Sequence, residues 1–234
     1  MPDMSLLRTM TLPERVRARP AVLFGAFGLE GALNALKLLL DLFETEARLG
    51  YCDRLTVELH DDNEIVIQCN DRGLLIDDTP VDGAPAWEHA FCRLYPGPRK
   101  EDEPYLLQLG AIHNTLYGDW DPSSPVLPTS ADHRVDLCCT QCAALSFHAE
   151  SVRGHVKHSL DFQKGYRTSG PTAEPTTEED GTLLRFRLDP DVFGSFGFSY
   201  EALTSCLLPR FSAAQGLHFA MTDQRTPAVK GGQT

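Results

Sequence analysis

Hydrophobic and polar positions repeat with two different periods along this chain, and the two periods separate expected helices from expected strands. Between Glu30 and Leu49 apolar side chains recur every three or four residues. One face carries Leu33, Leu36, Leu40, Phe43 and Ala47, and a second carries Leu38, Leu42 and Leu49. A helix that is apolar nearly all round is normally buried nearly all round. We therefore expect residues 30–49 to form a central, buried helix.

A strict alternation of apolar and polar side chains follows this helix. It covers Leu55–Leu59 and Glu64–Gln68, with Asp61, Asp62 and Asn63 between the two runs. A period of two residues is typical of a half-buried strand, and a short polar turn between two such runs predicts a hairpin. We expect one face of this hairpin to be buried.

The remaining patterns predict a mixture of short helices and strands. We expect helices near residues 85–95, 136–149 and 200–211, and strands near 146–153, 155–162, 182–188 and 217–221. The segment 168–181 is rich in Thr, Pro and Glu and predicts a mobile loop. Residues 76–135 hold eight prolines, and a loop with so many prolines lacks a continuous run of backbone N–H donors.

Composition and charge narrow the class of protein. The chain has 234 residues, 42% of them hydrophobic and 23% charged, which is ordinary for a globular protein. No apolar run reaches the ~18 residues of a membrane span, and no signal-peptide pattern precedes the first helix. We expect a cytoplasmic protein without a membrane partner. A net charge of −12 repels phosphate backbones, so we expect no direct nucleic-acid binding.

The cysteines and histidines do not form a recognisable reactive set. Seven cysteines in a chain without a signal peptide favour reduced thiols. Cys139 and Cys142 form a Cys-x-x-Cys pair with histidines nearby in sequence, and a zinc site is one interpretation of it. The interpretation that we favour is a helix facing the core, since a second such pair is lacking and buried free cysteines behave as small hydrophobes. We expect no metal and no catalytic residue.

Three motifs, in this order, resemble a known family. Residues 38–47 resemble the pattern Glu-Val-Val-Asp-Asn-x-x-x-Glu-Ala, and residues 69–73 resemble an aspartate followed by Asp-Gly-Arg-Gly. Residues 181–186 resemble Gly-Thr-x-x-x-Phe. The chain is thus similar to the N-terminal ATPase domain of DNA gyrase B and its topoisomerase IV counterpart, in the GHKL (Bergerat-fold) group. The resemblance implies an α+β fold, a two-layer sandwich whose mixed, mostly antiparallel sheet has helices on one face.

At the positions where this family carries out its chemistry, the chain has unsuited residues. Leu38 takes the position of the general base and Leu42 that of the Mg²⁺-binding asparagine. A leucine cannot accept a proton or coordinate a hard cation. Cys69 takes the position that reads adenine, and its sulfur is a poor acceptor for an amine. We expect neither ATP nor Mg²⁺ as a cofactor. The two leucines either fill the core, which we favour, or line a retained apolar pocket.

Other positions keep the family's residue types. Asp41, Glu46, Arg72, Gly73 and Thr182 match the motifs, and the resemblance implies that they are remnants of a nucleotide pocket. Glu46 with Arg72 is either a surviving site pair or a structural ion pair, and we favour the structural role. The relic of the ATP lid would lie at residues 109–113 or just before 135–137, where the repeated glycines are missing.

We divide the chain into an N-terminal arm at 1–18, a gyrase-B-like domain at 19–225 and a disordered tail at 226–234. The chain resembles the family but has unsuited residues at the catalytic positions. This combination favours a catalytically dead interaction or regulatory module. Its partner would be a protein, either a second copy of itself or a gyrase or topoisomerase IV subunit. Two alternatives are an ATP-binding protein with an altered site and a small-molecule sensor that uses the remodelled pocket.

Overall fold

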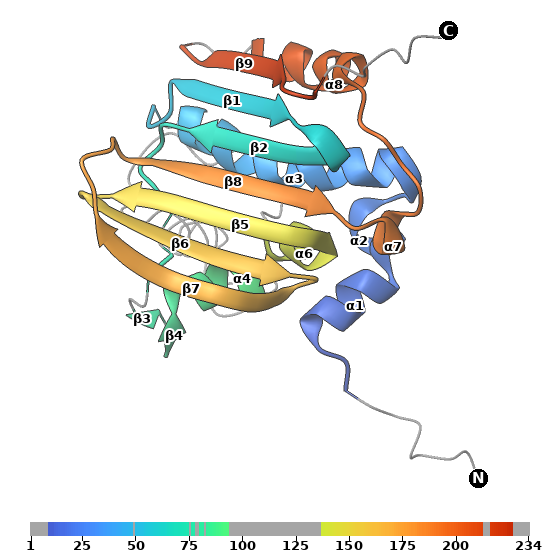
Figure 1. Cartoon of the computed structure of the whole chain (residues 1–234), viewed down its shortest axis with the longest axis horizontal. Helices are drawn as coiled ribbons and strands as arrows, with labels where there is room; N and C mark the ends of the chain where they lie inside the picture. The colour runs from blue at the N-terminus through green and yellow to red at the C-terminus, as the bar shows by residue number, and fades with distance from the viewer. Residues whose placement is uncertain are drawn as a thin grey trace, which may run out of the picture.

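The chain folds into a sheet with helices packed on one of its faces (Figure 1). A computed structural model describes residues 9–48, 50–74, 76–77, 80–81, 83–93, 137–212 and 216–226. Within these residues, seven strands form one sheet in the order β7-β6-β5-β8-β2-β1-β9. The predicted α+β sandwich is confirmed.

The main sheet is antiparallel except at one edge. Its strands are β1 (Arg54–Leu59), β2 (Glu64–Cys69), β5 (Ala144–Arg153), β6 (Val156–Gln163), β7 (Tyr166–Pro175), β8 (Gly181–Leu188) and β9 (His218–Asp223). Among the described strand pairs, β1 with β9 is the parallel one. A separate small ladder joins β3 (Pro80–Val81) to β4 (Ala84–Pro85).

The helices are α1 (Leu12–Ala18), α2 (Pro20–Phe24), α3 (Gly28–Arg48), α4 (Ala86–Cys92), α6 (Leu137–Ala143), α7 (Pro190–Phe193) and α8 (Tyr200–Ser212). Helix α3 runs behind the sheet in Figure 1. Leu36, Leu39, Leu40 and Phe43 of α3 are fully buried. The expected central helix is confirmed, because its apolar faces find the sheet on one side and other helices on the other.

The predicted β1–β2 hairpin is also confirmed. Leu55, Val57 and Leu59 are fully buried while the residues between them are not. The turn is a short 3-10 helix at Asp61–Asn63, in which Asp62 and Asn63 both have φ of 58°. Aspartate and asparagine tolerate this left-handed conformation better than most residues, so the polar turn suits a tight reversal.

Two expectations were wrong in their boundaries or type. Most of the segment 168–181 is not a loop, because β7 pairs with β6 up to Pro175. A tight reversal at Lys164 and Gly165, both with positive φ, aligns the two strands, and β7 is an exposed edge strand that needs no apolar alternation. The helix expected at 136–149 ends at Ala143, and β5 begins at the next residue.

The expected N-terminal arm is helical from Leu12 and lies against its own domain. Thr11 and Glu14 form a capping box at the start of α1, and Val16 is fully buried. Arg17 bonds the Cys142 carbonyl at the end of α6 and pairs with Asp189. Residues 9–18 therefore pack on the domain, and residues 1–8 lie outside the described chain.

The expected lid relic at 109–113 and the tail beyond Thr226 also lie outside the described residues. Within the described helices, none is both long and apolar enough to cross a membrane.

Candidate functional site

One face of α3 carries Leu38 and Leu42, which the resemblance aligns with the family's general base and metal ligand. Leu38, Leu42 and Glu46 are spaced four residues apart, so they lie along one side of the helix. Leu42 is 1% exposed and belongs to the core. Leu38 is only partly buried, although it packs against the same core. The expectation that both leucines are nearly inaccessible is thus met by Leu42 and not by Leu38.

Glu46 and Arg72 form a closely matched ion pair. Arg72 Nε lies 3.0 Å from Oε2 of Glu46, and Arg72 Nη2 lies 2.9 Å from Oε1. The Arg72 guanidinium also stacks 3.9 Å above the ring of Tyr51. Glu46 is fully buried. Because a buried carboxylate is costly without a partner, the fork of Arg72 is what allows an acid in this position.

A second buried carboxylate lies at the end of β2. Asp71 is 3% exposed and accepts hydrogen bonds from Thr182 Oγ1 at 2.8 and 3.1 Å. It also accepts one from the Gly73 backbone N–H at 3.0 Å. Thr182 Oγ1 in turn accepts from the Leu74 N–H at 3.3 Å. Asp71 and Thr182 therefore form a small polar network inside the fold.

Burial raises the pKa of Asp71 to about 7, and the hydrogen bond from Thr182 opposes this rise. The nearby charge of Glu46 raises the pKa further, whereas Gly73 and Arg72 lower it. Desolvation disfavours the charged form of a carboxyl group. Near neutral pH the Asp71 carboxyl group is therefore partly protonated, whereas an ordinary surface aspartate is ionised.

The turn after β2 is held against β5. Gly73 has φ of +72°, and a side chain there would bring Cβ to 2.3 Å from the carbonyl oxygen of Val152. The hydroxyl of Ser151 donates to the Leu74 carbonyl at 2.7 Å. A glycine is required here because the backbone adopts a left-handed conformation and approaches a neighbouring strand closely.

Cys69, at the position expected to read adenine, is bonded to Cys52. Cys69 ends β2 and Cys52 precedes β1, and their Cα atoms are 6.6 Å apart. The structure joins them as a disulfide, which differs from the expected reduced thiols. The hairpin brings together two cysteines that are 17 residues apart in sequence. A cysteine sulfur in this state offers no thiol to a ligand.

Asp41 contacts the C-terminal helix. It pairs with Arg210 of α8, which also pairs with Glu44. The Asp41 carboxylate therefore joins α3 to α8, a contact that the family motif does not indicate.

The expected core helix with the Cys-x-x-Cys pair is confirmed. Cys138, Cys139 and Cys142 are each 1% exposed. Burial raises the pKa of the Cys92 thiol, on α4, to about 11, and it also raises the pKa of the Cys142 thiol. The thiols of Cys92 and Cys142 are therefore protonated, and Cys138, Cys139 and Cys142 act as core side chains.

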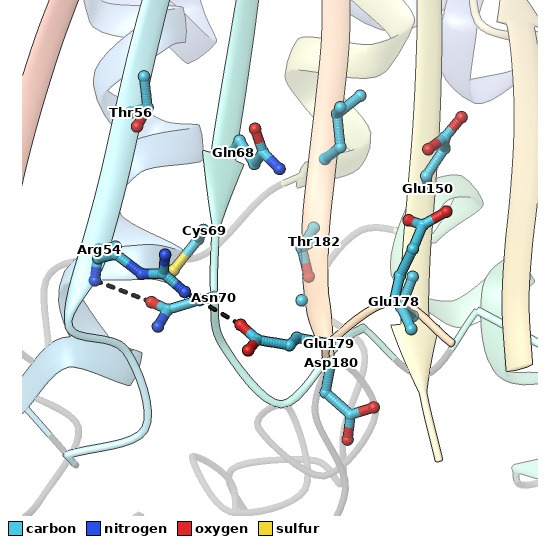
Figure 2. Close-up of a pocket in the computed structure, with 13 residues that line it drawn as sticks. Arg54, Thr56, Gln68, Cys69, Asn70, Glu150, Glu178, Glu179, Asp180 and Thr182 are labelled. Atoms are coloured by element: carbon cyan, nitrogen blue, oxygen red, sulfur yellow. Dashed lines mark hydrogen bonds and ion pairs between the residues drawn. The ribbon is translucent and has the colours of Figure 1, made fainter. Parts of the chain in front are cut away.

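The ends of β1, β2, β5 and β8 also line a hollow of about 440 Å³ (Figure 2). Arg54 pairs with Glu179 at 3.1 Å across it, and Asn70 accepts from the Arg54 backbone N–H at 2.8 Å. Glu150 and Glu178 are both paired with Lys157. Five of the thirteen lining residues are charged, and all five already have partners: Arg54, Glu150, Glu178, Glu179 and Asp180.

Three residues of the site were not predicted. Asp71 stands where the family motif has a glycine, so the motif assigns no polar role to this position. Tyr51 and Ser151 carry no motif at all. The sequence offered one indication of the buried network, the acidic residue directly before Arg72 and Gly73. An aspartate in a tight turn commonly accepts hydrogen bonds from nearby backbone N–H groups.

Comparison with known proteins agrees with this fold and these motifs. Over 225 residues the chain is 26% identical to the gyrase B protein of Thermus thermophilus, an alignment that covers 95% of this chain and 32% of the relative. It is 25% identical over 218 residues to the gyrase B protein of Treponema pallidum, covering 93% and 31%. It is 24% identical over 212 residues to the B-type chain of the type 2 topoisomerase of Aquifex aeolicus, covering 91% and 24%. A scan against protein-family models gives no match.

The chain resembles the N-terminal region of DNA gyrase B, as the order of its motifs predicted. The chain is thus similar to GHKL domains in the order of its motifs and in its α+β sandwich. The chain spans about a third of the length of the gyrase B relatives that it matches.

Proposed function

We propose that this gyrase-B-like domain does not hydrolyse ATP and serves as a protein-interaction or regulatory module. The burial of Leu42 carries the proposal, because this side chain fills the core where the resemblance implies a metal ligand. With Leu38 four residues earlier, the helix offers neither a general base nor an oxygen ligand at those two positions.

The partner that we propose is a second copy of the chain or a type II topoisomerase subunit. Two large apolar side chains support an interaction role, since Val22 is 77% exposed and Phe27 is 61% exposed. Both belong to the segment between α1 and α3. Exposed apolar groups that lie close together mark interaction surfaces more often than single ones do. A cytoplasmic location is part of the same proposal.

The experiment has two readouts. Hydrolysis of ATP by the purified chain is measured with and without Mg²⁺, and association is measured by light scattering after gel filtration, alone and mixed with a gyrase-B-type protein. The proposal predicts no hydrolysis and a species larger than the monomer in at least one sample. A monomer in both samples would contradict the interaction role.

A second candidate is an ATP-binding protein with an altered site. The buried Asp71 carboxylate on Thr182 favours it, because an acceptor beside Thr182 is what an adenine amino group requires. Thermal unfolding with and without ATP separates the two candidates. A ligand at 100 times its dissociation constant adds about 2.7 kcal/mol, and the first proposal predicts no such rise.

A further inference from the structure

The uncovered face of the sheet has a basic hollow on a chain whose net charge is −12. It occupies about 320 Å³, and its lining residues come from β5, β6, β8 and the reversal between β6 and β7. The lining residues are Leu145, Ser146, Gln163, Lys164 and Arg187. Among the described residues, the lining thus contains two cations, a hydroxyl and an amide, and it contains no carboxylate.

Arg187 is the residue whose bonding is incomplete. Its Nε is buried and has no hydrogen-bond partner among the described residues. Its Nη1 comes only within 3.8 Å of Asp62, whose side chain is 84% exposed. A pair of this length with an exposed acid contributes little. The Nε–H thus lacks an acceptor among the described residues, while the side chain as a whole is 37% exposed and can be reached by a ligand from solvent.

Lys164 is held beside Arg187 by the backbone. It adopts φ of 49° in the tight reversal, and its N–H donates to the Leu145 carbonyl at 3.2 Å. Its ammonium lies 3.2 Å from Asp191 and 3.6 Å from Asp189. Asp191 is 75% exposed, so its pair with Lys164 is weakened by water, whereas Asp189 is buried and is shared with Arg17. The direct cross-strand neighbours of Arg187 are Ser146 on β5, which adds a hydroxyl, and Glu64 on β2.

We propose that this hollow binds the phosphate group of a small molecule. A guanidinium, an ammonium, a hydroxyl and an amide together supply more donors than a planar carboxylate can accept, and a phosphate group accepts on three oxygens. A second hollow of about 250 Å³ shares Ser146 and Gln163 with the first. It is lined by both acidic and hydroxyl side chains, including Asp161 and Ser169, and would hold a polar, hydroxyl-bearing remainder of the ligand.

The test is a titration of the folded chain with inorganic phosphate and with glycerol phosphate at constant ionic strength. Binding is followed through the arginine Nε–Hε resonances in NMR spectra. We expect saturable binding and a shift of the Arg187 resonance. Arg187→Gln is expected to weaken binding about tenfold or more, the loss that removal of one charge-assisted hydrogen bond produces. Tighter binding of glycerol phosphate than of inorganic phosphate assigns the adjoining hollow to the glycerol part. Equal binding of the two assigns the site to free phosphate.

Arg54→Gln is the matched control, because Arg54 is an exposed arginine that lines a different hollow on the same sheet face. The control is expected to bind phosphate like the unmodified chain. Melting temperatures without phosphate show whether each variant folds. Where Arg187→Gln does not fold, Lys164→Gln replaces it with the same expectation. Absence of saturable binding, or an equal loss in Arg187→Gln and Arg54→Gln, overturns the proposal.

Discussion

The hydroxyl of Thr182 donates to the carboxylate of Asp71, with Oγ1 2.8 Å from Oδ1. Both side chains are almost completely buried. The partners come from neighbouring strands, Thr182 on β8 and Asp71 just after β2. A threonine retained from the family motif thus bonds a carboxylate that the motif does not contain.

Stability should decrease as the pH rises, because burial raises the pKa of Asp71 to about 7 from 3.8. The folded chain holds this proton more tightly than the unfolded chain does, so its contribution is complete below about pH 4 and is lost as the pH rises through 7. Between pH 5 and pH 8 this proton accounts for a decrease of roughly 2–3 kcal/mol in the free energy of unfolding, and we expect Asp71→Asn to abolish that part of the decrease. Urea unfolding at both pH values measures the difference.

Asp189→Asn is the control for this prediction. Burial tends to raise the pKa of Asp189, but the hydrogen bond from Arg17 keeps this pKa below its ordinary value. Its stabilising contribution is lost only as the pH falls below about 4. This variant should therefore shift both unfolding curves equally between pH 5 and pH 8. An unchanged pH dependence in Asp71→Asn would contradict the assignment.

Removing one partner of the Glu46–Arg72 pair should lower the stability of the fold strongly. Arg72→Leu leaves the fully buried Glu46 without this partner, and we expect a loss of roughly 3–5 kcal/mol in the free energy of unfolding. The double variant Glu46→Gln, Arg72→Leu should recover part of it. Arg93→Leu breaks the more exposed Arg93–Glu88 pair and should cost no more than about 1 kcal/mol. Equal losses at the two arginines would show that Glu46 is hydrated.

Gly73→Ala tests the close approach between the turn and β5. The added Cβ would meet the Val152 carbonyl oxygen at 2.3 Å, and we expect a loss of roughly 1–3 kcal/mol beyond that of the control. Gly154→Ala is the control, since Gly154 also has positive φ but no atom lies within 4 Å of the added carbon. Thermal unfolding of both variants measures the difference, and similar losses would show that the turn can move.

Leu42→Asn should destabilise the chain without creating activity. The change places an amide in a core position that is 1% exposed, at a cost of roughly 3–5 kcal/mol. Leu38→Glu on the same helix should cost less, because Leu38 is only partly buried. Denaturant unfolding measures both. A stable Leu42→Asn variant would contradict the core-filling role and favour a retained pocket.

Periodic patterns predicted the parts of the fold in which one side of an element is buried. Helix α3 and the β1–β2 hairpin were predicted because their apolar residues meet the same core. Strand β7 was missed because its side chains are mostly exposed and its pairing comes from the backbone. The boundary at Ala143 was missed because both α6 and the start of β5 are buried, so an apolar run continues across it.

The candidate site could be predicted only at positions where the residues match the family motifs. Glu46 and Arg72 lie together as that register implied. The bond between Asp71 and Thr182 joins residues 111 apart in sequence, and the motif placed a glycine at Asp71, so nothing in the local pattern indicated a buried acid. The Cys52–Cys69 bond depends in the same way on how the hairpin places two distant residues.

The absence of ATP hydrolysis is the central claim, and a turnover assay tests it most directly. The purified chain is incubated with ATP, with and without Mg²⁺, beside an Arg72→Leu variant. We predict that phosphate release stays at the background level in every sample, because the helix positions of the base and the metal ligand are leucines. A Mg²⁺-dependent rate that Arg72→Leu abolishes while the variant remains folded would contradict the account.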